Sequence, residues 1–299
     1  MGQMPLEITI GSNRALARLD RDMAPATCDA IAGLLPFKGT AHVAKLAGDE
    51  IMVHLPLILD MERRSAVADL SPGAVAFWPE RQVFCVYFGA IQDEDAEVTL
   101  LGHVDEGLAQ LVSAGETLHS AGGGLRPMAG LSSPEPSGAG ARHAEASRDA
   151  NDPMHAYGEI ATEEPAEIRT LLGKTGVMRP VGALVYAEAE TRKLHELLWL
   201  LRGALLTDGQ LPSVTPAIIR HFVRRLAGWY GLHDAGRVVS STLQRLEDGP
   251  GTDSLPILDG LILYVGRLNF WLDARIPWDE FNEVLHGMNA DARSETSTP

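Results

Sequence analysis

Residues 122–153 divide this chain into two parts of different character. This segment, GGGLRPMAGLSSPEPSGAGARHAEASRDANDP, is rich in Gly, Pro, Ala and Ser and poor in aliphatic side chains. Because such a composition buries too little apolar surface to offset the entropy lost on ordering, it predicts a flexible linker. We therefore expect a first domain over residues 1–121, a linker over 122–153, a second domain over 154–290 and a disordered tail over 291–299.

The first part has the pattern of a β-domain. Residues 4–10 and 14–19 flank a Gly-Ser-Asn turn as two short strands, and VAFWP, VFCVYFG and EVTLLGHV are further strand-like runs. Pro25 suits the first turn of a helix over ATCDAIAGLL, where its missing N–H costs little. Many short strands with few helices predict a closed or half-closed β-barrel.

The second part has the pattern of packed helices. LHELLWLLRGALL is apolar on nearly every side, TPAIIRHFVRRLAGWYG is amphipathic, and LPILDGLILYVGRLNFWL and PWDEFNEVLHGM add two more helices. These patterns predict a helical bundle, through which the chain could also form a homo-oligomer. The expected fold class is therefore α+β, with an N-terminal barrel followed by a C-terminal helical bundle.

Charge and hydropathy limit the partners that this chain can bind. The formal net charge of -15 argues against nucleic-acid binding, because phosphate binding needs a basic surface. The start, MGQMPLEITIG, lacks the pattern of a secretory leader, and Asp259 and Arg267 interrupt the apolar run 255–272. We expect a cytoplasmic protein without a membrane or nucleic-acid partner. Its 2 cysteines, Cys28 and Cys85, are expected to be buried free thiols.

The segment AHVAKLAGDEIMVHL places four ionisable side chains in a strand-like run. The pair Gly48-Asp49 suits a two-residue hairpin turn. The resulting pairing puts Lys45, Glu50 and His54 on one side of the sheet, since side chains alternate along a strand. His42 then lies on the other side, toward the apolar barrel interior, although a one-residue slip in register would exchange the two sets.

Each set allows two interpretations. Lys45, Glu50 and His54 form either an ordinary solvated face or the wall of a pocket. His42 is either a hydrogen-bonded core histidine or a general acid or base, because an unperturbed imidazole titrates near neutral pH. The sequence has no GxGxxG before a helix and no GxxxxGK[ST], HExxH or GxSxG motif, so we expect neither a cofactor nor a metal.

Several short motifs of the first part resemble a family of small bacterial cyclophilin-like barrels. The matching residues are Ala24, Pro25 and Thr27; Leu35 and Pro36; His42, Gly48 and Glu50; Pro72 and Gly73; and Tyr87 with Gly89. The resemblance covers the first domain and implies a closed barrel. The catalytic Phe-His-Arg neighbourhood of true cyclophilins is not found, and a shared barrel carries no function by itself.

A cyclophilin-like barrel followed by a helical bundle resembles the cucumopine (mikimopine) synthases of the opine pathway. The resemblance of the second part rests on architecture and length. It implies condensation of histidine with 2-oxoglutarate or a similar 2-oxo acid without a redox cofactor. In that family an imine forms first, and the imidazole carbon then closes a ring onto it in a Pictet–Spengler type reaction.

This chemistry assigns roles to residues of the chain. Glu50 and His54 are the expected proton-transfer groups, with His42 as the alternative if the register slips, and Tyr87 is an expected hydrogen-bond donor. Lys45 is the expected clamp for a substrate carboxylate, since carboxylates are bound by cations. The other expected substrate-binding residues are Arg14, Trp78, His155 and Tyr157. The last two lie in MHAYGEI, where they share a side only if that segment is extended.

Two functions of other classes remain open. The barrel could be a non-catalytic module that binds a small ligand or a protein, with the bundle as its oligomerisation part. It could also be a hydrolase of small amides. Incubation with histidine and 2-oxoglutarate distinguishes these possibilities, because only the synthase forms a new adduct.

Overall fold

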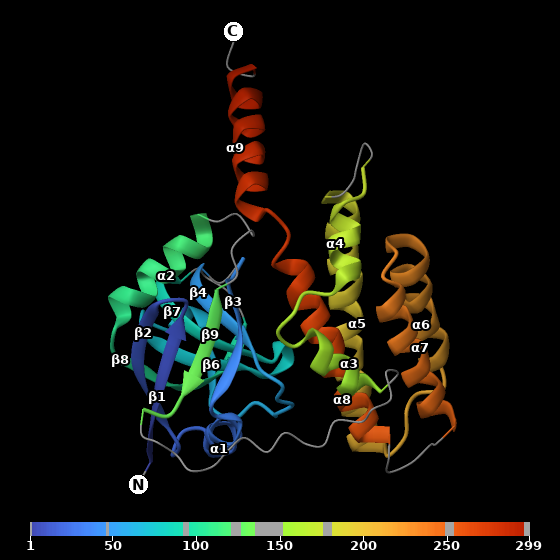
Figure 1. Ribbon diagram of the computed structural model, residues 1–299, viewed down its shortest axis with the longest axis horizontal. Coiled ribbons are helices and arrows are strands. Elements are labelled where there is room, and N and C mark those ends of the chain that lie inside the picture. The colour runs from blue at the N-terminus through green and yellow to red at the C-terminus, as the bar shows by residue number, and fades with distance from the viewer. Residues whose placement is uncertain are drawn as a thin grey trace.

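The computed structural model describes residues 2–45, 48–91, 96–120, 127–134, 152–175, 181–248 and 254–295. Within these residues, eight antiparallel strands close into a barrel in the order β2–β1–β9–β3–β4–β7–β6–β8, because β8 also pairs with β2 (Figure 1). A short β5 pairs with the first residues of β8. The strands are β1 (Gln3–Ile10), β2 (Asn13–Asp20), β3 (Phe37–Val43), β4 (Gly48–His54), β5 (Arg64–Ala66), β6 (Ala74–Trp78), β7 (Val83–Ile91), β8 (Glu97–Glu106) and β9 (Met128–Ser132).

A bundle of helices lies beside the barrel, and α9 extends beyond both (Figure 1). The helices are α1 (Pro25–Leu34), α2 (Leu108–Ser120), α3 (Pro153–Ile160), α4 (Ala166–Leu172), α5 (Val181–Asp208), α6 (Thr215–Val223), α7 (His233–Asp248), α8 (Ser254–Asp273) and α9 (Trp278–Glu295). A π-helical turn over Arg224–Tyr230 continues α6. This arrangement confirms the predicted α+β fold, with the barrel first and the helices after it.

The interior of the barrel is apolar. Alternate residues of β1 are buried, as expected for a strand with one face toward a core. The first two helices complete this core, because α1 contributes Cys28 and Ile31 and α2 contributes Leu111 and Leu118. Cys85 is also buried, and both cysteines are free thiols as predicted.

The central helix of the bundle is α8, which packs most extensively on α5 and α3. It is buried along almost its whole length, so its apolar side chains face neighbours in all directions. By length and composition alone α8 could cross a membrane, but 78% of its apolar window is buried inside this structure. That burial is typical of the core helix of a bundle.

The composition of residues 122–153 predicts a linker throughout, and the structure differs over part of that range. Met128–Ser132 forms β9, which pairs with β1 on one side and with β3 on the other. Ala129 and Leu131 point into the barrel core, so a few apolar side chains suffice to fix a strand between two others. Residues 121–126 and 135–151 lie outside the described residues.

The end of the chain also differs from the expectation. The polar composition of residues 291–299 predicts a disordered tail, whereas α9 continues through Glu295. Ala, Arg and Glu in that stretch are favourable helix residues, so the helix begun by Trp278 can propagate through them.

Candidate active site

Three neighbouring barrel strands, β4, β7 and β6, are buried on both faces. Their inward side chains fill the barrel, and their outward side chains belong to a second cluster that also contains Val67, from the segment before β6. Phe270 of α8 packs into the outer cluster together with Ala76, Cys85 and Tyr87. A β-strand buried on both faces has no solvated side, so every polar group on its outer face needs an explanation.

The hairpin of β3 and β4 has a register that differs from the predicted one. His42 pairs with Met52 and Val43 with Ile51, whereas the predicted turn would pair Val43 with His54. Gly48 has a φ of +96°, but it lies at an irregularity in the pairing of β4 with β7 rather than in a two-residue turn. Positive φ suits a glycine in either setting, which is why the turn could not be identified from the residue alone.

This register brings three predicted proton-transfer residues to the same face. His42, Glu50 and His54 all point outward from the barrel, because side chains alternate along paired strands. The expectation that His42 faces the barrel interior is therefore wrong. Tyr87 pairs with Glu50 across β7 and β4 and belongs to the same outer cluster. All four side chains are buried.

Aromatic rings close over the two histidines. The ring centroids of His42 and Phe270 are 3.8 Å apart, and those of His54 and Phe270 are 5.8 Å apart. Tyr157 of α3 lies on the other side, with its ring centroid 6.0 Å from that of His54. The site is therefore enclosed by the barrel, α8 and α3 together.

The bundle contributes a buried cation, Arg267 of α8. Its side chain is 1% exposed, and it donates hydrogen bonds to the Thr40 hydroxyl at 2.9 Å and to the Ile160 carbonyl at 3.2 Å. The guanidinium also lies over the rings of Phe270 and Trp271. Because an arginine stays protonated in proteins, the site contains a buried positive charge.

A third histidine enters the region from α5. His195 Nε2 lies 2.8 Å from the Gln82 side-chain oxygen, and both residues are buried. Because the Gln82 amide nitrogen donates to the Pro79 carbonyl at 2.9 Å, its oxygen must accept, and the proton of His195 resides on Nε2. Gly266 makes this contact possible, since a Cβ there would lie 2.5 Å from the Gln82 oxygen.

Burial controls the protonation of these imidazoles. Burial, together with the charges of Arg267, His195 and His42, holds the pKa of His54 well below its usual value. Burial and the neighbouring Arg81 lower the pKa of His195 to about 3. Both rings are therefore neutral at physiological pH. Among the described residues, neither ring nitrogen of His54 has a hydrogen-bond partner, so the neutral ring has one donor and one acceptor to spare.

Lys45 does not share the strand face of Glu50 and His54. It follows the end of β3, and its positive charge acts on the carboxylate of Asp273 at the end of α8. Lys45 thus lies at the edge of the same region, because Asp273 Oδ2 is also 3.4 Å from His42 Nε2. Its expected role as a carboxylate clamp stays a prediction.

Two of the predicted substrate-binding residues lie apart from the cluster. Arg14 is in β2, four strands from β4 in either direction around the barrel, and pairs with Glu7 on the exposed surface. His155 pairs with Glu159 at the surface of α3. The segment that holds His155 is a helix rather than a strand, so His155 and Tyr157 diverge and only Tyr157 faces His54.

Trp78 lies at the rim of the outer cluster. It is partly buried at the end of β6, and the Arg81 guanidinium lies 5.5 Å from the centre of its ring. Its contacts are those of packing beside the site.

The sequence pattern missed the residues that the bundle supplies. They are Arg267 and Asp273 on α8 and His195 on α5, and Gln82 is the partner of His195. A signal was present, because a charge inside an otherwise apolar helix such as LPILDGLILYVGRLNFWL is costly unless it is partnered. That signal indicates a buried polar site, but it does not show which barrel strand packs against the helix.

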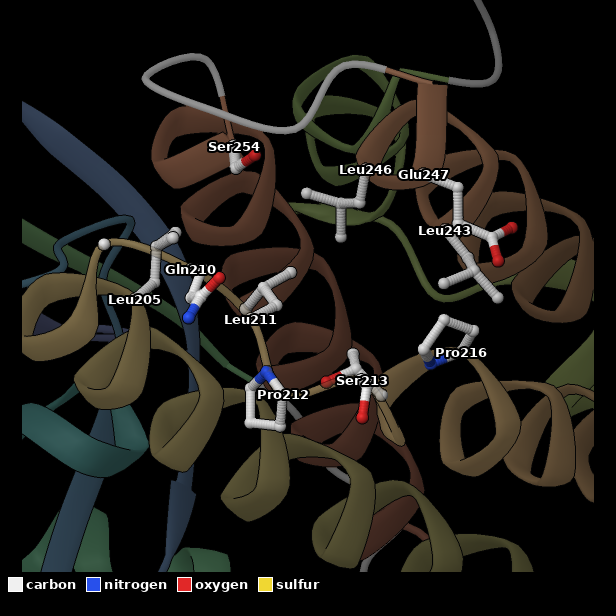
Figure 2. A pocket seen from close by; sticks show the side chains of 12 residues that line it. Leu205, Gln210, Leu211, Pro212, Ser213, Pro216, Leu243, Leu246, Glu247 and Ser254 are labelled. Carbon is white, nitrogen blue, oxygen red and sulfur yellow. The ribbon is translucent and has the colours of Figure 1, made fainter.

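A separate hollow of about 400 Å³ lies at the opposite end of α8 (Figure 2). Leu211, Leu246 and Pro216 surround it, and Ser254, the first residue of α8, borders it. Arg267 is thirteen residues further along the helix, a rise of about 20 Å. The hollow is mainly apolar and shares no residue with the buried cluster.

Chemically, the buried cluster combines a carboxylate, two neutral or protonatable imidazoles, a phenol and a guanidinium. Such a set can exchange protons with a substrate and hold an anionic group in a region shielded from water. Among the residues that the structure describes, no three His, Cys, Asp or Glu side chains are placed to hold a metal ion.

Comparisons with known proteins agree with this architecture. Residues 4–119 match the family model described as Cyclophilin-like, so the N-terminal part of the chain is a cyclophilin-like domain. β9 lies beyond that match and yet completes the barrel. A search of curated protein sequences gave no match.

Among solved structures, the chain is similar to McbB, whose structure was determined in complex with tryptophan. The similarity has a TM-score of 0.78 at 20% identity and covers 93% of this chain and 99% of McbB, so the barrel and the helices share one fold. The solution structure of the hypothetical protein AF2241 from Archaeoglobus fulgidus covers 44% of this chain and 97% of that protein, at 23% identity and a TM-score of 0.34. The second likeness is too low to support an argument. The resemblance to cucumopine synthases stays a prediction.

Proposed function

We propose that this chain condenses an amino acid carrying a nucleophilic aromatic ring with a 2-oxo acid, without a redox cofactor. Histidine and 2-oxoglutarate are the specific pair that the resemblance to cucumopine synthases implies. The observation that carries the proposal is the common outer face of His42, Glu50 and His54, which α8 closes with Arg267.

The first step joins the amine to the 2-oxo acid. The amino group attacks the ketone carbon, and the oxygen leaves as water after it has gained two protons, giving an imine. A group that can both give and take a proton near the ketone accelerates this step by about 10²–10⁴-fold. Glu50 and His54 are the expected donors and acceptors, and the Tyr87 phenol can donate to the oxygen as it develops negative charge.

The second step closes the ring. The aromatic carbon attacks the imine carbon, the C=N electron pair moves to the protonated nitrogen, and the aromatic C–H proton is then lost to a base. The proton lost balances the proton gained by the imine nitrogen, so the overall reaction releases one water and needs no oxidant or reductant. Two bases of the same buried face, Glu50 and His42, lie beside the neutral imidazole of His54, and either is suited to take this proton.

Binding requires a cation for each substrate carboxylate that becomes buried. Arg267 lies within the cluster and Lys45 at its edge, so the two cations are placed at different depths. Guanidinium groups bind carboxylates with two parallel hydrogen bonds, which also orients the substrate. We therefore assign Arg267 to the buried carboxylate and Lys45 to a carboxylate at the entrance.

The comparison with McbB supports an amino-acid substrate. McbB was determined with tryptophan, an amino acid that carries an aromatic ring, and it shares its fold with this chain from the barrel through the helices. A likeness at 20% identity does not transfer the substrate. Histidine and tryptophan are therefore both tested as substrates.

The proposal is tested by incubating the purified chain with an amino acid and 2-oxoglutarate in the absence of nicotinamide. We expect an adduct whose mass is the sum of the substrates less one water. An open imine has the same mass, so the products are treated with borohydride. The cyclised product keeps its mass, whereas an imine gains two hydrogens. Histidine, tryptophan and alanine are compared, since alanine lacks a ring that can close.

No borohydride-stable adduct with any ring-bearing amino acid would contradict the proposal. Thermal stabilisation by the substrates without turnover would instead indicate a binding module. Release of ammonia from small amides would indicate a hydrolase.

A further inference from the structure

Asp273, the last residue of α8, lies next to His42 of the barrel. Its Oδ2 atom is 3.4 Å from His42 Nε2, and its side chain is 19% exposed. The other carboxylate oxygen, Oδ1, accepts a hydrogen bond from the indole nitrogen of Trp278 at 3.2 Å. Each oxygen of Asp273 therefore has its own neighbour, which fixes the plane of the carboxylate.

The ring of His42 is held as well. It packs against Phe270, with 3.8 Å between the two ring centroids. Phe270 precedes Asp273 by three residues on α8. One element thus supplies both the surface on which the imidazole lies and the carboxylate at its edge. A carboxylate at the edge of an imidazole selects the tautomer and stabilises the protonated ring.

Other charges face this pair from each neighbouring element. Burial raises the pKa of Asp273, and Lys45, the Trp278 hydrogen bond, Arg81 and Arg192 act in the opposite direction. On the side of His42, the charged and titratable groups that the structure describes include Glu50 and His54 of β4 and Arg267 of α8. Asp273 is the carboxylate that the bundle brings to the Nε2 edge of His42.

We propose that Asp273 is a positioning residue, which orients His42 so that Nδ1 accepts a proton from the substrate and which stabilises the imidazolium that results. This inference rests on the proposed condensation. During ring closure the aromatic C–H bond breaks, its electron pair returns to the ring, and the proton goes to Nδ1. Asp273 keeps its charge, and His42 later returns the proton to solvent or to the product amine.

The role of the helical bundle follows from this arrangement. The bundle covers the site and also sets the basicity of a barrel histidine, so the barrel alone would lack the carboxylate that makes His42 a strong proton acceptor. The 3.4 Å between His42 Nε2 and Asp273 Oδ2 is an ion-pair distance, so the carboxylate is close enough to stabilise a protonated ring.

The test measures the titration midpoint of the His42 ring by NMR in the substrate-free, full-length chain, with the signal assigned by its loss in H42N. In Asp273→Asn the midpoint is expected to fall by about one pH unit, since the imidazolium loses its counter-charge. The acidic limb of kcat/KM should move in the same direction, and kcat should fall. Asp273→Glu should restore part of the midpoint.

Asp259→Asn is the matched control, because it makes the same change on the same helix at a carboxylate that pairs with Arg202 instead. It should leave the His42 midpoint unchanged. If Asp273→Asn does not fold, Trp278→Phe removes the hydrogen bond to Oδ1 and should give a smaller change in the same two measurements.

An unchanged His42 midpoint in Asp273→Asn would overturn the inference. The proposed function fails separately, if the wild-type chain forms no cyclised adduct. A lowered midpoint without any product would leave the pairing of Asp273 with His42 in place and remove only the reaction.

Discussion

The guanidinium of Arg267 in α8 donates a hydrogen bond to the Thr40 hydroxyl in β3 at 2.9 Å. This bond joins the helical bundle to the outer face of the barrel, on the same strand as His42. Because the charge is buried, the groups around it must remain in place or be left unsatisfied. The barrel and the bundle are therefore two walls of one site.

Replacing Arg267 by Met should destabilise the chain. Thr40 and Ile160 would each lose a charged hydrogen-bond donor, so the free energy of unfolding should fall by about 2–3 kcal/mol. The KM for the 2-oxo acid should rise as well if Arg267 binds a carboxylate. Arg14→Met is the control, because Arg14 lies on the exposed side of β2. Chemical denaturation and steady-state kinetics of both variants check this. If Arg267→Met and Arg14→Met had the same unfolding free energy and the same KM, Arg267 would not belong to the site.

Replacing Glu50 by Gln keeps the shape of a fully buried side chain and removes its charge. If Glu50 transfers protons, turnover should fall by about 10²–10⁴-fold while the melting temperature changes little. Glu116→Gln, at an exposed position of α2, serves as the control. Adduct formation is measured by mass spectrometry. A Glu50→Gln variant with the wild-type rate would exclude Glu50 as a catalytic group.

A methyl group at Gly266 should separate Gln82 from His195. The added Cβ would lie 2.5 Å from the Gln82 oxygen and 2.8 Å from His195 Nε2, so one partner must move. We expect Gly266→Ala to lower the free energy of unfolding by about 1–3 kcal/mol through overpacking. Gly203→Ala in α5 meets nothing within 4 Å and should instead stabilise the helix by about 1 kcal/mol. Chemical denaturation measures both changes. If the free energy of unfolding changed in the same direction in both variants, the close contact of Gly266 with Gln82 and His195 would be contradicted.

The stability of the chain should depend on pH through His195. The pKa of this ring is about 3 in the fold and near 6.5 when unfolded. Between these values the unfolded chain binds a proton that the folded chain does not, so stability falls as the pH falls, by about 1.4 kcal/mol per pH unit. His195→Gln keeps a donor toward Gln82 and should remove this contribution between pH 6 and pH 4.

The measurement is the difference in unfolding free energy between the wild-type chain and His195→Gln across that range. Glu167, whose pKa burial raises to about 7, changes stability in the opposite sense, but it is present in both chains and cancels. His103→Gln at the exposed surface is the control. Equal slopes for His195→Gln and the wild-type chain would show that His195 is not buried in its neutral form.

β9 should be among the protected strands of the barrel. Its amides pair with β1 and β3, so hydrogen exchange over residues 128–132 should be slow. The loop over residues 210–213 is the reference for rapid exchange, because it has no strand partner. If the amides of residues 128–132 exchanged as fast as those of the loop, this segment would be a linker, as its composition predicts, and not a strand.

The strands and helices with clear periodicity could be predicted from the sequence. The paired strands at residues 4–10 and 14–19 follow from alternation, and the helix after Pro25 follows from a start signal with apolar spacing. β9 could not be predicted in this way. Its residues are MAGLS, and their neighbours in the barrel, rather than their own propensities, make them a strand.

The candidate site was predictable in its residue types but not in its geometry. Glu50 and His54 can be predicted because polar groups occur in a strand-like run, and Tyr87 follows from a motif shared with the cyclophilin-like barrels. The face on which His42 lies depends on the register of the hairpin. The predicted register rests on a two-residue turn at Gly48, but this glycine lies at a bulge, and the sequence pattern of a bulge glycine resembles that of a turn glycine. The cations and carboxylates of α8 could not be matched to the barrel, because no local pattern encodes which helix covers which strands.

The most direct test of this account is the structure of the chain crystallised with its condensation product. The account predicts electron density between the outer face of β3 and β4 and α8, in contact with Glu50 and His54, with a product carboxylate on Arg267. Product bound in the hollow beside Leu211 and Leu246, or anywhere else with the cluster unchanged, would contradict it.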